Sequence, residues 1–514
     1  MPVTVEVTAP PVLTPIVQTS VVEVTRLVET GGERFDGRLI VGIPEYPNSL
    51  DLPQANSPTA RMVAWHLYDS LVQTDAQSNI LPALAESWVI SEDNLTYTFT
   101  LRRGVSFHNG EQFTADAVRF SWERGSTPAN ANSAAWQAVS EVVVVDDYTV
   151  RLVTAEPNVN LLRLIADQWA MVPPSYIAEV GENSFVERPI GTGPFQFVES
   201  EQNGYITLEA NPTYWNPSQP QLRYLSFRWV INPAERFDLL RNGRIHVVSG
   251  LEAAEAVPLL SAPDVRLVSY PQDRIYFIGF SRATAGDDSP LEDARVRLAM
   301  NHAINRPEMI TTLFDGLAHL STSLVTPSNL GYDPALLPLE YDPVLARSLL
   351  EAAGFGDGFT VEMACPEEAY PLFNEVCLWV QADLAEVGIT AELTFLPPTE
   401  FFETPPRDLP ALFGDRRTGD GTEAYSRLNG LLGGSDYATW YDEDIGRLIR
   451  QLRQTAEPST RADLYAALQA ELQADPPFIY LYEPLRFEAV NAAVQNYTPR
   501  ASEIHLFSDV YITP

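Results

Sequence analysis

Hydrophobic and polar positions alternate most regularly at residues 96–101, where threonines are separated by two aromatic residues and a leucine. A period of two predicts a strand with one buried face. Residues 105–107 resume the alternation, and the Asn-Gly pair at 109–110 predicts a tight turn. Thr114 then offers a side-chain oxygen to the free amides of a helix start. This stretch therefore predicts strand, turn, strand and helix, in that order.

The same two periodicities continue along the rest of the chain. Period-two or short apolar runs predict strands at 38–43, 141–145, 148–153, 224–230, 265–269, 275–280, 359–364 and 478–482. Apolar stripes at helical spacing predict helices at 61–72, 161–166, 234–242, 293–304 and 373–384. Strands that alternate with helices predict an α/β fold.

Several segments hold residue types at fixed spacing, in a fixed order along the chain. They are 84–88 (LAESW), 95–102 (LTYTFTLR), 104–110 (GVSFHNG), 113–116 (FTAD), 191–195 (GTGPF), 208–215 (LEANPTYW), 341–343 (YDP) and 354–355 (GF). Together they resemble the signature of the extracytoplasmic solute-binding proteins of family 5, the oligopeptide, dipeptide and nickel receptors of ABC importers. The resemblance covers residues 36 to 514.

This resemblance implies an α/β fold of the periplasmic-binding-protein type II (Venus-flytrap) kind, with two large lobes, an extra subdomain and a two-stranded hinge. We expect chain crossings near residues 270 and 484. The expected parts are a tether (1–35), lobe I (36–68, 187–270 and 485–514), an inserted subdomain (69–186) and lobe II (271–484).

The implied function is that of a monomeric receptor that captures a small solute, an oligopeptide or dipeptide, between two lobes. The receptor delivers this ligand to the transmembrane subunits of an ABC permease. An oligosaccharide or another solute is the alternative cargo, because selectivity lies in the loops of the cleft and not in the fold.

The charge balance excludes some other partners. The chain has 68 acidic and 33 basic residues, a formal net charge of −35. Nucleic acid and anionic lipid both need a basic surface, so neither is an expected partner. All the basic residues are arginines, which we interpret as the mark of a GC-rich genome or of an acid-rich habitat such as brine.

The N-terminal segment differs from the rest. Residues 1–35 are rich in Val, Thr and Pro, which predicts an extended tether, with an edge strand as the alternative. No apolar run is long enough to span a bilayer, and no export signal follows Met1. With the resemblance, this implies an extracytoplasmic protein, periplasmic or tethered to the outer face of the membrane as a lipoprotein, whose anchor is missing from this sequence.

The two cysteines, Cys365 and Cys377, fall in one predicted strand-to-helix unit. A disulfide can form in an oxidising compartment if their Cα atoms lie within about 7 Å. Two buried thiols are the alternative. No histidine is near enough in the sequence to complete a zinc site, and we expect no metal and no cofactor.

The loop after the strand near residue 412 is the main site candidate. In peptide-binding members of the family, an aspartate after this strand receives the ligand's α-ammonium group. Asp420 occupies that position, judged by its offset from Leu428 and Asn429. The tryptophan usual after Gly414 is absent, and the loop is about two residues longer than usual.

Two arginines in the same loop give an alternative. Arg416 and Arg417 could grip a carboxylate or phosphate in bidentate fashion. They could also pair with Asp415 and Asp420, or belong to an ordinary solvated loop.

Other candidate ligand contacts come from elsewhere in the chain. Each has a structural alternative: an ordinary loop for the polar residues, and core packing for the aromatic ones. The candidates are Asn56, Ser57 and Thr59 in the loop after the first strand, Tyr276 beside the cleft, and Trp65, Trp169 and Trp440 as platforms for a sugar.

An exported hydrolase is the rival class. The six histidines are scattered with no HExxH motif, and Gly279-Phe280-Ser281 lacks the second glycine of a nucleophile elbow. A pair of catalytic carboxylates, as in a glycoside hydrolase, remains an alternative because the chain has so many acidic residues. The sequence favours binding without covalent chemistry.

Overall fold

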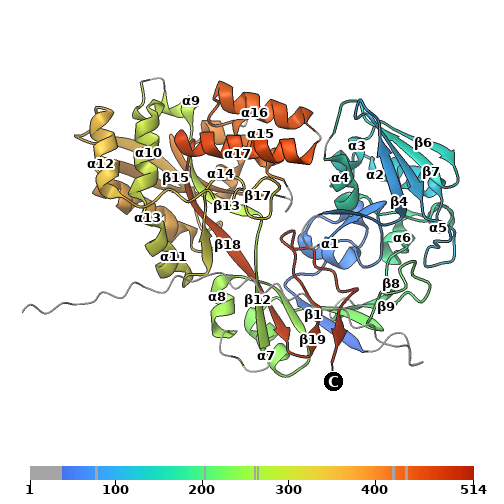
Figure 1. Cartoon of the computed structure of the whole chain (residues 1–514). Helices are drawn as coiled ribbons and strands as arrows, with labels where there is room; N and C mark the ends of the chain where they lie inside the picture. Colours follow the sequence, from blue (N-terminus) through green and yellow to red (C-terminus); the bar gives the residue numbers. More distant parts are fainter. Residues whose placement is uncertain are drawn as a thin grey trace, which may run out of the picture. The chain divides into compact units, whose positions relative to one another are not determined.

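The computed structural model describes residues 37–75, 79–158, 160–201, 204–259, 262, 265–286, 288–419, 423–434, 438–455 and 457–513 (Figure 1). The predicted tether and Asp420 lie outside these residues. No helix of the described residues is both long enough and apolar enough to cross a bilayer.

A single long strand, β18 (Phe478–Asn491), connects the two main parts of the molecule. Its first half pairs with β13 (Arg274–Phe280) and β14 (Ala318–Leu320), and its second half pairs with β11 (Val247–Leu251) and β12 (Val265–Pro271). Figure 1 shows β18 in red, passing from one part to the other. The sequence predicted only residues 478–482 of this strand.

We call the part on the β13 side the second lobe. Here β15 pairs in parallel with both β16 and β17, and β17 pairs antiparallel with β13. The strands are β15 (Phe359–Pro366), β16 (Ile389–Leu396) and β17 (Leu412–Thr418), and the helices are α9 (Arg282–Ala285), α10 (Ala294–Ala303), α11 (Arg306–Phe314), α12 (Pro343–Ala352), α13 (Phe373–Glu386), α14 (Pro398–Glu403), α15 (Tyr425–Leu432), α16 (Glu443–Gln454) and α17 (Pro458–Ala474).

We call the remainder the first lobe. Its main sheet runs β11, β1, β10, β9 and β8 in order, and a separate sheet runs β4, β5, β7 and β6. The elements are β1 (Arg38–Ile43), α1 (Pro58–Ala64), β2 (Val72–Thr74), β3 (Ile80–Pro82), β4 (Ala85–Ile90), β5 (Thr96–Leu101), α2 (Ala115–Gly125), α3 (Ser133–Gln137), β6 (Glu141–Asp146), β7 (Thr149–Val153), α4 (Leu161–Gln168), α5 (Pro174–Val180), α6 (Glu182–Glu187), β8 (Phe195–Ser200), β9 (Tyr205–Ala210), β10 (Tyr224–Trp229), α7 (Pro233–Arg241), α8 (Ala253–Ala256), β19 (Val494–Gln495) and β20 (Tyr511–Ile512).

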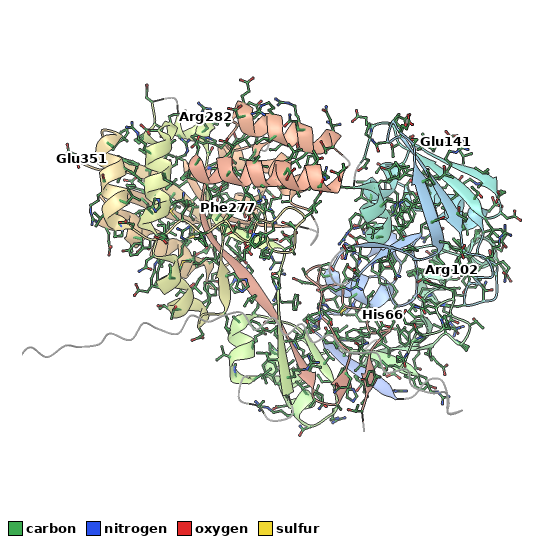
Figure 2. All side chains as sticks on the ribbon, viewed as in Figure 1. His66, Arg102, Glu141, Phe277, Arg282 and Glu351 are labelled. Atoms are coloured by element: carbon green, nitrogen blue, oxygen red, sulfur yellow. A yellow bond between two sulfur atoms is a disulfide. The ribbon has the colours of Figure 1, made fainter. Side chains whose placement is uncertain are left out.

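Each part has its own buried core. In the second lobe, one cluster of buried side chains runs from Ile275 to Tyr482 and includes Phe277, which packs against Phe413 and Phe478 (Figure 2). In the first lobe, one cluster lies on the β1 sheet and another on the β5 sheet. Apolar contact therefore holds each sheet to its own helices.

His66 joins distant segments of the first lobe (Figure 2). Its Nδ1 lies 2.8 Å from the Met62 carbonyl oxygen, and its Nε2 lies 3.0 Å from the Phe507 amide nitrogen. Because Nε2 accepts from an N–H group, the ring proton is on Nδ1. Burial lowers the pKa of His66 to about 4, so the neutral ring ties α1 to the C-terminal segment.

Most predicted elements are confirmed, and two are corrected. Residues 105–107 form no strand; an isolated bridge joins Ser106 to Gln112 there. The helix predicted at 61–72 runs instead from Pro58 to Ala64, because Ser57 accepts from the Ala60 amide and Pro58 fits the first turn.

Cys365 and Cys377 form a disulfide that joins β15 to α13, with Cα atoms 6.7 Å apart. The sequence left a disulfide and two buried thiols as alternatives, and the structure contains the disulfide. A Cβ on Gly414 of β17 would lie 2.6 Å from the Cys365 sulfur, so the disulfide packs directly against the strand that leads to the candidate site.

Candidate functional site

The chain crosses between the two lobes at residues 272–275 and returns at residues 483–484; we call these the hinge segments. The β12 ladder ends at Pro271 opposite Leu485, and the β13 ladder begins at Tyr276 opposite Tyr482. Four residues of one strand therefore lie opposite two of the other. Such a bulge interrupts regular pairing and re-aims side chains.

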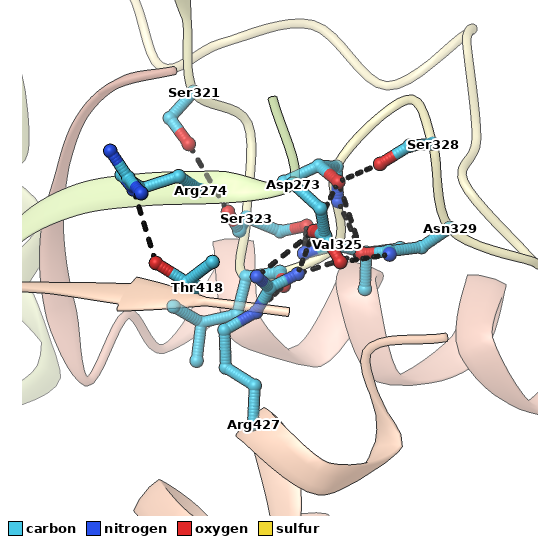
Figure 3. A network of polar contacts seen from close by, with 11 residues as sticks. Asp273, Arg274, Ser321, Ser323, Val325, Ser328, Asn329, Thr418 and Arg427 are labelled. Atoms are coloured by element: carbon cyan, nitrogen blue, oxygen red, sulfur yellow. Dashed lines mark hydrogen bonds and ion pairs between the residues drawn. The ribbon is translucent and has the colours of Figure 1, made fainter. Parts of the chain in front are cut away.

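Asp273, in the outgoing hinge segment, is the centre of a buried polar network (Figure 3). Its Oδ1 accepts from both terminal nitrogens of Arg427 at 3.1 Å and from Thr326 Oγ1 at 2.7 Å. Its Oδ2 accepts from Asn329 Nδ2 at 3.0 Å. Asp273 is only 1% exposed and Arg427 5%. A buried carboxylate paired and hydrogen-bonded in this way has a fixed orientation.

This network holds the loop that follows β17. The Gly419 amide donates to the Asp273 carbonyl oxygen at 2.7 Å. A Cβ on Gly419 would lie 1.9 Å from Asp273 Oδ2, so the close approach of loop and carboxylate requires glycine. Gly419 immediately precedes Asp420 in the sequence. The hinge segment therefore holds Gly419, the last described residue before Asp420 in the sequence.

One face of the second-lobe sheet carries aromatic and basic side chains beside this loop. Arg274 lies opposite Thr418 and Tyr276 lies opposite Arg416. The Tyr276 ring stacks on Tyr482, with centroids 4.6 Å apart and an interplanar angle of 5°. Tyr276 is 4% exposed, so this predicted site residue is packed into an aromatic cluster.

Among the described residues, no carboxylate forms an ion pair with either arginine on this face, although the charge of Glu503 acts on Arg274. The Arg416 guanidinium lies 4.2 Å from the centroid of the Tyr370 ring. Arg274 Nε donates to Thr418 Oγ1 at 3.1 Å (Figure 3). Burial lowers the pKa of Arg274, and the positive charge of Arg416 lowers it further. Burial also lowers the pKa of Arg416. Tyr276 and Tyr370 raise it by more, so the pKa of Arg416 is above its ordinary value.

Arg417 is in a different situation. Its guanidinium forms an ion pair with Asp415. The same carboxylate accepts from the Tyr370 hydroxyl at 3.0 Å and from the Arg416 amide at 2.7 Å. The two consecutive arginines therefore differ: Arg417 forms an ion pair with a carboxylate, and Arg416 forms none with the residues that the structure describes.

Two of the three predicted tryptophan platforms, Trp169 and Trp440, lie in the cores, whereas Trp65 is half-buried. Trp169 is fully buried and stacks on Trp136, with centroids 4.6 Å apart. Trp440 is 4% exposed, against Phe280. Neither ring presents a face to a ligand in this structure.

The polar residues predicted in the loop before α1 shape the start of that helix. Ser57 is its N-cap, and its Oγ accepts from the Ala60 amide at 3.2 Å. The amide of exposed Asn56 donates to Asn48 Oδ1 at 3.2 Å. Thr59 is half-buried in the first turn of α1. Among the described residues, no hydrogen bond joins these three residues to the face that carries Arg274 and Arg416.

The first lobe holds a separate cavity of about 390 Å³. Its walls come from the end of α1, from β2 and from the C-terminal segment 496–509, and include Trp65, Asp69 and Arg500. All the lining residues belong to the first lobe.

Asp69 is held in this cavity wall by neutral donors. It accepts from Thr192 Oγ1 at 2.9 Å, Tyr214 Oη at 2.8 Å and Trp215 Nε1 at 3.0 Å. Burial raises its pKa to about 6, although the three donors oppose this shift. The donors bind Asp69 to two other segments of the lobe.

Sequence reasoning missed Asp273, Arg274 and Arg427. A signal for the first was available, because Gln272-Asp273 interrupts two apolar strands at the predicted crossing, where a polar pair is unexpected. Arg427 lies 154 positions further on, and nothing local marks it as the partner.

Comparison with known proteins agrees with this geometry. The family model of the bacterial extracellular solute-binding proteins, family 5 (middle region), matches residues 79–439. This chain belongs to that family, the extracytoplasmic solute-binding proteins of ABC importers.

Particular relatives show the extent of the similarity. The glutathione-binding protein GsiB of Escherichia coli O1:K1 / APEC is 29% identical over 359 residues, 69% of each chain. The structure of HbpA2 from Haemophilus parasuis matches with a TM-score of 0.87 at 24% identity, covering 93% of this chain and 100% of that one. DppA from Helicobacter pylori, in complex with the peptide STSA, matches with a TM-score of 0.70 at 25% identity, covering 93% and 98%. The fold is the type II periplasmic-binding-protein fold.

Proposed function

We propose that this chain captures a short peptide between its two lobes and delivers it to the membrane permease of an ABC importer. Family membership supports the receptor role. The observation that carries the choice of peptide is the anchoring of Gly419 by the Asp273–Arg427 network, one residue before Asp420. A carboxylate is a good partner for an ammonium group removed from water.

The proteins it resembles support the same class of ligand. One is described as a glutathione-binding protein, and another was solved with a bound tetrapeptide. The oligosaccharide alternative has less support, since Trp169 and Trp440 are buried.

Binding itself drives the conformational step. A ligand that touches both lobes makes some contacts only in the closed state, so it shifts the population toward closure by its difference in affinity. The hinge segments lie between the β12–β18 and β13–β18 ladders, where the regular pairing with β18 is interrupted. The permease then recognises the closed form, and no bond is made or broken.

The test is native mass spectrometry of the purified full chain before and after denaturation, to weigh what it carries. We expect a set of peptide masses that Asp420→Ala abolishes and Asp357→Ala retains. Asp357 is the control because it is an exposed aspartate of the same lobe. A single glycan mass, or peptide retention unchanged in Asp420→Ala, would contradict the proposal.

A further inference from the structure

We propose that Glu156 of the first lobe and Arg453 of the second lobe form an electrostatic latch, an ion pair that holds the two lobes together away from the hinge segments. This inference rests on the closing step of the proposed function, and it does not depend on which ligand the chain captures.

The first support is the ion pair itself. The Arg453 guanidinium pairs with the Glu156 carboxylate, although the two residues are 297 positions apart. Arg453 lies in the last turn of α16, and Glu156 lies between β7 and α4. Arg447 and Arg461, on α16 and α17, pair instead with acids of their own lobe. Figure 1 shows α16 and α17 at the top, pointing toward α4, and the β12–β18 ladder in the lower part. The latch therefore joins the lobes at a second place, in addition to the hinge.

The second support is a cavity to which both lobes contribute. It has a volume of about 330 Å³, and Glu156 and Arg453 are both in its wall. Tyr425 of α15 lines it from the second lobe, and Asn158 and Asn160 line it from the first. The two lobes therefore face each other around the ion pair over several residues, and the contact is more than two isolated side chains.

The third support is the attachment of the Glu156 loop to the first lobe. The Asn158 carbonyl oxygen accepts from the Tyr97 hydroxyl at 2.8 Å and from the Leu161 amide at 3.1 Å. The Asn160 amide donates to Asn158 Oδ1 at 3.1 Å. Tyr97 belongs to β5 and is buried. Because the loop is bonded both to β5 and to the start of α4, the backbone near Glu156 is held in place.

The end of α16 is attached to the second lobe in a similar way. Arg461 Nη1 donates to the carbonyl oxygens of Leu452 and Thr455, which lie on either side of Arg453 in the sequence. Arg461 is buried and pairs with Glu423. The C-terminal end of a helix also favours a cation. Exposed ion pairs gain little when flexible segments must first be ordered, whereas here the backbone on both sides is already fixed.

The expected strength of the latch is modest. The side chain of Arg453 is 61% exposed and that of Glu156 is 69% exposed. Ion pairs with this exposure change an equilibrium by about 1.5- to 5-fold. Because the pair exists only while the lobes are together, it shifts the population toward the closed form by that factor. An interaction of this size favours closure and still lets the lobes reopen to release a ligand.

The absence of lysine from the sequence gives a direct test of the contact. Arg453→Lys adds the one side-chain amine of the full chain. A zero-length carbodiimide joins an amine to a carboxylate that it touches, forming an amide while the carboxylate oxygen leaves on the reagent as a urea. We expect peptide mapping by mass spectrometry to find this lysine joined to Glu156. The yield should fall severalfold in 1 M salt, where the screening length is about 3 Å.

Arg447→Lys is the matched control, because Arg447 is an exposed arginine of the same helix that pairs with Asp444. It should give no product with Glu156. An Arg453→Lys lysine joined to other acids but not to Glu156, or joined to none, would overturn the latch. The cross-link needs the lobes to meet but needs no peptide, so its result is independent of the test of peptide capture.

A charge swap tests whether the contact affects closure. The two native cysteines are bonded to each other, so Glu141→Cys and Glu351→Cys add one exposed thiol to each lobe for a pair of dyes (Figure 2). Single-molecule energy transfer then measures the ratio of closed to open chains without ligand. Arg453→Gln should lower this ratio by about 1.5- to 5-fold, and Arg453→Glu by more, because two like charges then face each other.

Combining Glu156→Arg with Arg453→Glu should restore the ratio to within about twofold of the unmodified chain, because the pair is rebuilt with its charges exchanged. Thermal unfolding of each variant verifies that both lobes are intact. Equal ratios in all variants would overturn the latch. So would a combined variant that stays as open as Arg453→Glu alone, since that is the result of a change confined to the second lobe.

Discussion

Two buried aspartates, one in the first lobe and one in the hinge, are held in different ways. Asp69 in the first lobe accepts only from neutral hydroxyl and indole donors among its described partners. Asp273 in the hinge accepts from neutral donors and also from the guanidinium of Arg427. The first carboxylate pins scaffold segments together. The second is part of an ion pair beside the candidate binding loop.

The difference matters because a buried ion pair contributes little net stability. Two charges must lose their water, and a well-packed apolar pair is often as stable. Neutral donors suffice to hold the scaffold at Asp69. The charged pair at Asp273 instead fixes a direction, since Arg427 and Asn329 leave the carboxylate a single orientation against Gly419. We interpret this as a rigid residue next to the candidate site.

The variant with the largest expected effect is Arg427→Met. It leaves Asp273 buried without its cation, and we expect a loss of about 3–5 kcal/mol of unfolding free energy. Asp273→Asn combined with Arg427→Met should recover part of that loss, because no lone charge is left. Urea unfolding followed by fluorescence measures both. A loss below about 1 kcal/mol for the single variant would show that the ion pair does not hold the hinge.

The next test uses pH and Glu483 in the returning hinge segment. Burial raises the pKa of Glu483 to about 8, although Arg427 opposes the shift. A raised carboxyl pKa gives stability that is fully present below about pH 4.5 and is lost as pH rises through about 8. Glu483→Gln cannot titrate, so its stability relative to the unmodified chain should rise by a few kcal/mol from pH 4.5 to pH 9. A flat difference would contradict this.

A smaller effect is expected for Asp69→Asn. The amide offers one acceptor oxygen to three donors, so about 1–3 kcal/mol should be lost at pH 7. Because Asp69 pins the scaffold and not the ligand loop, peptide affinity should stay unchanged in the folded variant. Thermal unfolding and titration with a peptide that the unmodified chain retains measure the two quantities. A stable variant with lost affinity would assign Asp69 to a binding site.

The smallest test is a matched pair, Thr192→Val and Thr326→Val. Each removes one hydroxyl donor from its aspartate. We expect about 1 kcal/mol for Thr326→Val and somewhat more for Thr192→Val, because Asp273 keeps its arginine and Asp69 has only neutral donors. Equal losses, or the reverse order in urea unfolding, would remove the contrast between the two sites.

The sequence predicted what is local. The alternation at 96–101 predicted β5, and the apolar stripe at 373–384 predicted α13, both of which the structure contains. Both depend on neighbours within a few positions. The strand predicted at residues 105–107 was wrong. Alternation also arises where two side chains point into a core but the backbone has no ladder of strand pairing.

The contacts of the candidate site could be predicted less well from the sequence. Arg416 and Arg417 are adjacent and looked equivalent, yet strand alternation turns them to opposite faces, and only one meets Asp415. Arg274 becomes the neighbour of Arg416 only through the register of β13 against β17. Such pairings join residues more than a hundred positions apart, and no local pattern specifies them.

The continuous strand β18 has a consequence for how this molecule can be rearranged. Tyr270 of β12 lies opposite Arg486 of β18, so the chain leaves the first lobe and returns to it on adjacent strands. A two-residue Asn-Gly turn from residue 271 to residue 485 would close those strands into a hairpin. The second lobe is then a single continuous insertion in the gene: we expect that it can be removed at one junction, or exchanged between relatives at two, while the first lobe keeps its sheet.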